Sequence, residues 1–147
     1  MSEFLVRGWN TCTPDVDVGD DVLVLEDRKG EFKRVQVKTS TATVRNNGYS
    51  VQFHIPLKQL RQYISPEIHY VFMTRHQDKW VNTMIIRRKD LYEMYKSAQI
   101  GVAASDNLAL YLTFKDKLSL VAIPIWADLY ISYKSLRRII IVFTHLS

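Results

Sequence analysis

The sequence predicts an α+β fold in a single domain that spans residues 1–147. Short runs rich in Val, Ile, Phe and Tyr recur along the chain, as in β-strands, and two segments have the apolar spacing of helices. The chain has 47% hydrophobic residues and is long enough to bury one core. Neither repeats nor low-complexity linkers divide it, although residues 101–147 are only weakly assigned to the domain.

The first elements predicted are the end of a helix and a β-hairpin. Residues 2–8 are typical of the last turns of a helix, with Gly8 as its C-terminal stop. A strand follows at residues 22–25, and a polar turn at 27–30 contains a glycine. The returning strand begins at Phe32 and continues through Val44.

The next segment is a second hairpin, which leads into the remaining elements. Asn46-Asn47-Gly48 predicts a tight turn, because Asn-Gly readily adopts positive φ at its two central positions. The strand at residues 49–55 alternates apolar and polar side chains and ends at Pro56. The other predicted elements are a short helix at 57–64, strands at 68–74 and 80–86, a helix at 89–98 and a strand at 108–114.

The register of the first hairpin follows from the length of its loop. With four residues in the loop, Glu26 pairs with Glu31, and counting outward from that pair places Asp21 opposite Gln36. Directly opposed residues share a face of the sheet, with Cβ atoms roughly 4.5–5.5 Å apart. Alternation along the strand places Lys38 on the same face. A three- or five-residue loop would shift the pairing and point Asp21 away from Gln36.

These residue types suit metal-dependent hydrolysis of a phosphodiester. Mg²⁺, or Mn²⁺ in its place, prefers oxygen ligands and keeps several waters. Asp21 offers a charged oxygen, Gln36 a neutral one and Val37 its backbone carbonyl. The metal would acidify and orient a water, and Lys38 could position that water or stabilise charge on the phosphate. The alternative is a surface hairpin whose polar residues have no catalytic role.

Two motifs carry a resemblance to a known family: Asp15-x-Asp17-x-Gly19-x-Asp21 and Val35-Gln36-Val37-Lys38-Thr39-Ser40. Together they resemble the core of the PD-(D/E)XK nuclease superfamily. They are closest to its branch with Gln-x-Lys in place of (D/E)-x-Lys, which includes intron-encoded homing endonucleases and small bacterial proteins. The resemblance covers residues 5–40 and extends more weakly through Leu91. It implies a restriction-endonuclease-like mixed central sheet flanked by helices, with Asp21 and Gln36 as metal ligands and Lys38 as the catalytic lysine.

Two departures from the family pattern bear on activity. Gln36 is uncharged, so the site has one negative charge fewer for holding Mg²⁺ than an Asp or Glu would give. Relatives in this branch usually have a glutamate on the helix before the first strand, but that helix is expected to be truncated here, with the family position upstream of Met1. Glu3 is the candidate substitute, although a side chain so near the helix end is more often solvated. A nuclease fold that binds nucleic acid without cutting it therefore remains open.

The charge distribution favours DNA as the partner. The net charge is +5, and it is concentrated outside the first hairpin. Residues 1–40 carry eight acids and six bases, whereas residues 41–147 carry seven acids and fourteen bases. An acidic cluster within a basic protein suits a nuclease that must attract a polyanion. Thr39, Ser40 and Arg45 continue the strand beyond Lys38 and are candidate phosphate contacts, although basic residues that merely solvate helices would explain part of the excess.

Cysteine usage and hydropathy indicate a cytoplasmic protein with neither a membrane partner nor a small-molecule cofactor. Cys12 is the single cysteine, so no internal disulfide can form, and we expect its side chain to be buried or half-buried. No signal-peptide pattern is present, and the apolar stretch at 118–127 is too short to span a bilayer. The β-prone run at 137–143 leaves open a strand or a homo-oligomer contact.

Other kinds of site have little support. The four histidines lack zinc-like spacing, and the chain has neither a Gly-rich phosphate loop nor a Gly-x-Ser-x-Gly elbow. Trp80 and Tyr49 could contact bases, although aromatic residues in strands more often belong to the core. The sequence therefore predicts a metal-dependent DNA endonuclease. The open alternatives are a nucleic-acid-binding protein that does not cut and an interaction domain that uses its apolar C-terminal segment.

Overall fold

The computed structural model describes residues 5, 10–13, 21–26, 30–45 and 48–114 of the chain. These residues form an α+β structure, as the sequence predicts. The described strands are β1 (Asn10–Cys12), β2 (Val22–Glu26), β3 (Glu31–Thr41), β4 (Thr43–Arg45), β5 (Gly48–Pro56), β6 (Ile68–His76), β7 (Lys79–Arg87), β8 (Val102–Ala104) and β9 (Asn107–Phe114). The described helices are α2 (Leu57–Arg61) and α3 (Arg88–Lys96).

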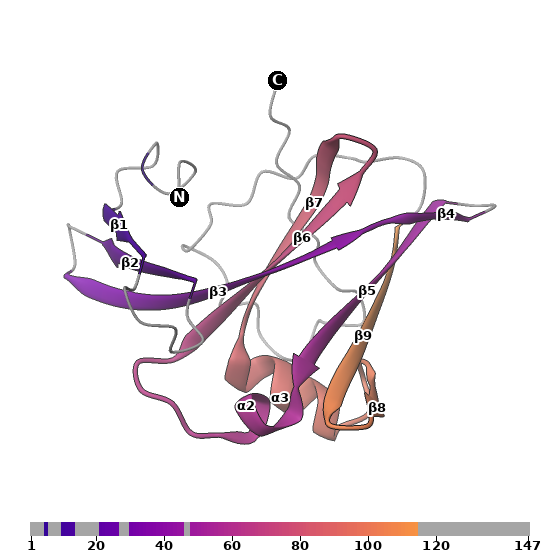
Figure 1. The fold of residues 1–147 in the computed structure, drawn as a ribbon. Coiled ribbons are helices and arrows are strands. Elements are labelled where there is room, and N and C mark those ends of the chain that lie inside the picture. The colour runs from indigo at the N-terminus through magenta and orange to yellow at the C-terminus, as the bar shows by residue number, and fades with distance from the viewer. Residues whose placement is uncertain (1–4, 6–9, 14–20, 27–29, 46–47, 115–147) are drawn as a thin grey trace.

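The strands form two sheets rather than the one central sheet that the sequence predicts (Figure 1). Sheet A has the order β1-β2-β3-β6-β7 and is mixed, because β3 and β6 run parallel while its other neighbours are antiparallel. Sheet B has the order β4-β5-β9-β8 and is antiparallel. Helices α2 and α3 contact each other and lie together at one end of the sheets.

The chain passes from sheet A to sheet B at Ala42. The sequence predicts one strand through Val44, but β3 ends at Thr41 and the chain continues as β4 in the other sheet. Ala42 is buried, and its N–H donates a hydrogen bond to the carbonyl of Arg75 in β6 at 2.7 Å. This bond is the last that β3 and its extension make toward sheet A, after which β4 pairs with β5.

The main core lies between the two sheets and the two helices. Its aromatic centre is Phe53 of β5 against Phe72 of β6, with ring centroids 4.9 Å apart, and Tyr70 lies beside Phe72 at 5.8 Å. Alternate residues of β5 and β9 line the same core. A second, smaller cluster occupies the opposite face of sheet A and consists of Val22, Val24, Val35, Val71 and Ile85. Sheet A is therefore apolar on both faces near its centre.

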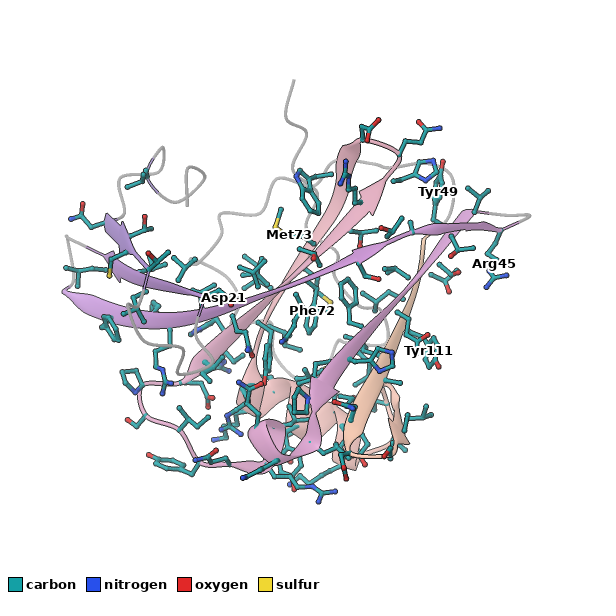
Figure 2. The ribbon with its side chains drawn as sticks, in the orientation of Figure 1. Asp21, Arg45, Tyr49, Phe72, Met73 and Tyr111 are labelled. Atoms are coloured by element: carbon teal, nitrogen blue, oxygen red, sulfur yellow. The ribbon has the colours of Figure 1, made fainter. Side chains whose placement is uncertain are left out.

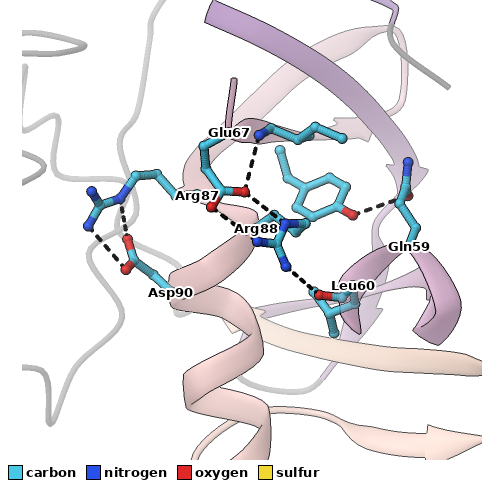
Figure 3. Close-up of polar contacts among 8 residues, drawn as sticks. Gln59, Leu60, Glu67, Arg87, Arg88 and Asp90 are labelled. Atoms are coloured by element: carbon cyan, nitrogen blue, oxygen red, sulfur yellow. Dashed lines mark hydrogen bonds and ion pairs between the residues drawn. The ribbon is translucent and has the colours of Figure 1, made fainter. Parts of the chain in front are cut away.

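A buried arginine joins the ends of the two helices (Figure 3). The guanidinium of Arg88 donates to both carboxylate oxygens of Glu67, at 2.7 and 3.1 Å, and to the carbonyl of Leu60 at 2.7 Å. Nearby, the hydroxyl of Tyr70 donates to Gln59 at 3.1 Å, and burial raises the pKa of that hydroxyl. The last turn of α2 is thus fixed against the start of α3 through Arg88.

Several local predictions differ from the structure. Helix α2 ends at Arg61 instead of residue 64, and the exposed three-residue strand β8 was not predicted. Trp80 was expected in the core but is 45% exposed near the start of β7, so that prediction is wrong. Cys12 was expected to be buried or half-buried but is exposed on the edge strand β1. Tyr49 is half-buried and its ring lies against His76.

No helix within the described residues is long and apolar enough to cross a membrane. Of the predicted N-terminal helix, only Leu5 is described, and it is helical and exposed. The apolar stretches at 118–127 and 137–143 lie outside the described residues.

Candidate metal centre

The register of the β2–β3 hairpin is the predicted one. Glu26 pairs with Glu31, and the ladder continues outward to Val22 opposite Val35. Residue 30, which closes the turn, is a glycine with φ +62°, a left-handed conformation that glycine adopts without strain. As predicted, Val35 and Val37 point to one face of β3 and pack in the smaller cluster. Gln36 and Lys38 therefore lie on the other face.

Asp21 lies one residue before β2, where the regular ladder has ended. Its N–H donates to the carbonyl of Val35 at 3.0 Å, so the direct pair with Gln36 that the sequence predicts does not form. Its carboxylate oxygen Oδ2 instead accepts a hydrogen bond from the N–H of Val37 at 2.5 Å. The carboxylate thus lies beside the backbone of β3, close to where β2 begins (Figure 2).

The Val37 carbonyl lies on the same edge of β3 as this carboxylate. The N–H and C=O groups of one strand residue point toward the same neighbouring strand. Because the Val37 N–H points at Asp21, its carbonyl points to that side too, away from β6. The Asp21 carboxylate and the Val37 carbonyl are therefore on the same side of β3, and their joint role as metal ligands stays a prediction.

Gln36 supplies a buried oxygen on the adjacent face. Its side chain is only 6% exposed and lies in register with Tyr70 of β6, on the side of the main core. Its carboxamide oxygen Oε1 has no hydrogen-bond partner within the part of the chain that the structure describes. A buried acceptor without a donor destabilises the fold by about 1–3 kcal/mol, so such groups often have a function. A bound cation is one partner that would satisfy it.

Lys38 is half-buried and shares the face of Gln36, in register with Phe72. The three candidate phosphate contacts are less closely grouped. Ser40 lies on the face of Lys38, whereas Thr39 is exposed on the opposite face. Arg45 is exposed on β4 in sheet B, where its Nε donates to Ser50 Oγ at 3.0 Å. They are therefore spread over two sheets instead of one strand.

The remaining predicted ligand lies outside the described residues. Glu3 is not among them, nor are Asp15 and Asp17 of the family-like motif. Within the described ranges, no three His, Cys, Asp or Glu side chains gather closely enough to hold a metal ion. The oxygen ligands that the described residues offer are thus Asp21, Gln36 and the Val37 carbonyl.

Sequence reasoning missed a second group of polar residues on the outward side of sheet B. Gln52 and His54 of β5 point outward, with Gln52 Nε2 and His54 Nε2 3.1 Å apart. Gln52 pairs across the ladder with Tyr111 of β9, which is 57% exposed. The alternation of polar and apolar residues at 49–55 is visible in the sequence, but the strand that would lie beside it is not.

No family model, curated protein or solved structure matches the chain, so its function is inferred from its own residues and their geometry.

Proposed function

We propose that the chain is a metal-dependent endonuclease that hydrolyses DNA phosphodiester bonds, with the mixed sheet A in the place of the central sheet of a restriction-endonuclease-like fold of the PD-(D/E)XK type. The observation that carries this proposal is the buried carboxamide oxygen of Gln36, which has no hydrogen-bond partner among the described residues and lies on the strand whose backbone contacts Asp21. A surface hairpin without a function would gain stability from an apolar residue at this position. A metal ligand explains why an amide is there.

The chemistry of these groups fits Mg²⁺. Asp21, Gln36 and the Val37 carbonyl are all oxygen ligands, one charged and two neutral, and Mg²⁺ usually retains waters at its other positions. Mn²⁺ accepts the same ligands. When bound, the metal would acidify a water and neutralise the charge that develops on the phosphate.

Lys38 is the proposed catalytic residue from the chain itself. It lies on the face of Gln36, two residues along β3, and is half-buried. An ammonium group there would orient the attacking water and stabilise negative charge on the phosphoryl oxygens. Partial exclusion of solvent strengthens this interaction, because the local dielectric is lower than in bulk water.

The basic character of the chain would attract the substrate. The net charge of +5 favours association with a polyanion, and Ser40, Thr39 and Arg45 are proposed to contact phosphates beyond the site. Of these, Ser40 is the best placed, since it follows Lys38 on the same face of β3.

A second candidate function is nucleic-acid binding without cleavage. It is favoured by the small number of charged ligands, because Asp21 is the carboxylate that the described residues supply and Gln36 is neutral. Mg²⁺ held by one carboxylate binds more weakly than at sites with two. The same surface would then bind DNA through its basic residues alone.

Plasmid nicking in the presence of Mg²⁺ or Mn²⁺ tests the proposal. We expect the wild-type chain to nick plasmid, and both Asp21→Asn and Lys38→Ala to lose this activity. Lys89→Ala is the matched control, because Lys89 is exposed on α3 and should retain activity. Salt-sensitive DNA binding without nicking, unchanged by Asp21→Asn, would support the second candidate instead. Absence of DNA binding at low salt would contradict both.

A further inference from the structure

We infer that the outer face of sheet B is a second binding surface, which takes unpaired nucleotides of single-stranded nucleic acid. By outer face we mean the side of β4, β5 and β9 that points away from the main core. The six residues of this face that bear on binding are Arg45, Ser50, Gln52, His54, Tyr111 and Thr113. The inference does not depend on the metal centre, which lies on sheet A.

Alternation along the strands defines this face. In β5, Val51, Phe53 and Ile55 are buried in the main core, so the residues between them point outward. In β9, Leu110 and Leu112 are buried in the same core, and Tyr111 between them points outward. In Figure 2, Tyr111 and Arg45 both project away from sheet A.

Tyr111 is the centre of the surface. It is 57% exposed on the third strand of a four-stranded sheet, so much of its ring is open to solvent and to a ligand. Its direct cross-strand partner is Gln52, and His54 neighbours Gln52 on the same strand. An exposed ring with amide and imidazole groups beside it can stack on a base while its neighbours hydrogen-bond the base edge.

The charge of the face is complementary to a phosphate backbone. Arg45 lies at one side, and its hydrogen bond to Ser50 Oγ holds the guanidinium over the sheet. Ser50 is a diagonal neighbour of Tyr111, a relationship that places Cβ atoms roughly 7–8 Å apart. One nucleotide can span this separation between its base and its phosphate. None of the six residues of the face is acidic.

Single-stranded nucleic acid suits this surface better than a duplex. Reading the major groove requires a projecting helix or a two-stranded ribbon, whereas the outer face is the side of a sheet. Sheet faces with exposed aromatic residues bind single nucleic-acid strands, whose unstacked bases are available to stack on the aromatic rings. A partner protein that buries Tyr111 is the competing occupant, and the experiment below separates the two.

Fluorescence anisotropy with a labelled oligothymidylate tests the inference. Measurements in EDTA keep cleavage and the metal centre out of the result. We expect Tyr111→Ala to weaken binding roughly 5- to 100-fold, as base stacking on an aromatic ring predicts, and Tyr111→Phe to retain it. Tyr63→Ala is the matched control, because Tyr63 is 86% exposed elsewhere and should leave affinity unchanged.

The salt dependence provides a second readout. Loss of one phosphate contact in Arg45→Ala should lower the slope of log affinity against log salt by about 0.7. Equal affinity of Tyr111→Ala and wild type, or equal losses in Tyr111→Ala and Tyr63→Ala, would overturn the inference. No binding by wild type at low salt would also overturn it and would favour the protein partner. Single-strand binding without plasmid nicking would count against the proposed function alone, and nicking without single-strand binding would count against this inference alone.

Discussion

The carboxylate of Asp21 accepts a hydrogen bond from the backbone N–H of Val37, which lies sixteen residues further along the chain. This contact extends the association of the first hairpin beyond the last regular pair, Val22 with Val35. It also holds the carboxylate on the side of β3 toward which the Val37 carbonyl points. A residue proposed to bind metal therefore also helps to hold the hairpin together.

This double role of Asp21 predicts different effects for two substitutions. Asp21→Asn keeps an oxygen acceptor for the Val37 N–H, whereas Asp21→Ala removes it. Without metal, we expect Asp21→Ala to lower the free energy of unfolding by about 1–2 kcal/mol and Asp21→Asn by less than half of that. Urea denaturation in EDTA measures both. Equal losses would show that the hydrogen bond contributes little in solution.

The two consecutive arginines at the start of α3 should differ strongly. Arg88 is buried and donates to both the Glu67 carboxylate and the Leu60 carbonyl, so Arg88→Ala removes the cation that pairs with Glu67 and the side-chain donor to Leu60. We expect a loss of about 3–5 kcal/mol in the free energy of unfolding. Arg87 forms a partly exposed ion pair with Asp90, and Arg87→Ala should cost less than about 1 kcal/mol. Thermal and urea denaturation compare them, and similar losses would contradict the role given to Arg88.

The stability of the fold should fall in mild acid because of His69. Burial, and then the cations of Lys33 and Arg87, lower the pKa of this imidazole from 6.5 to about 4. Above pH 6.5 the imidazole is neutral in both states, and below it the unfolded chain binds the proton more readily. Stability is therefore lost between pH 6.5 and 4, by at most about 3 kcal/mol.

The comparison that isolates His69 is His69→Gln, which cannot titrate. As pH falls from 6.5 to 4, wild type should lose free energy of unfolding relative to this variant. Carboxylates titrate equally in both proteins and cancel in the difference. A difference that stays constant across this range would mean that His69 is not held neutral by the fold.

Two glycines with positive φ should tolerate alanine very differently. At Gly30, φ is +62° and a Cβ would meet nothing within 4 Å, so Gly30→Ala should cost about 1–2 kcal/mol from backbone strain alone. At Gly101, φ is +66° and a Cβ would lie 2.5 Å from Leu108 Cδ1 and 2.9 Å from the Ala109 carbonyl. Overpacking should add about 1–3 kcal/mol there. Chemical denaturation ranks the two variants, and equal losses would place Gly101 outside the β8–β9 packing.

The hairpin register could be predicted once a four-residue loop was assumed. With that loop, the alternating valines of β3 bury Val35 and leave Gln36 with Lys38 on the other face, whereas a loop one residue shorter or longer would have shifted the pairing. The crossing between sheets at Ala42 was not predictable, because the residues on either side of it have similar β propensity. The contact that marks the crossing, the backbone hydrogen bond from Ala42 to Arg75, joins residues 33 positions apart.

The placement of Gln36 and Lys38 on one face of β3 could be predicted from the sequence, but the contacts around the candidate site could not. The register places Asp21 near Gln36, but it does not specify which backbone N–H donates to the Asp21 carboxylate. In the structure that donor is Val37, so the carboxylate lies beside Val37. Within the described residues Gln36 Oε1 has no hydrogen-bond partner, and this could not be read from the sequence because it depends on tertiary packing. Tyr111 was missed because its cross-strand neighbour, Gln52, lies 59 residues earlier in the chain.

The most direct measurement is the stabilisation that Mg²⁺ gives to wild type and to Gln36→Leu. Without metal, the free energy of unfolding of Gln36→Leu should equal or exceed that of wild type. The substitution removes a buried oxygen that has no partner in the described structure. At Mg²⁺ a hundredfold above its dissociation constant, wild type should gain about 2.7 kcal/mol and Gln36→Leu markedly less. Equal stabilisation of both proteins, or none in wild type, would contradict a metal site at Gln36.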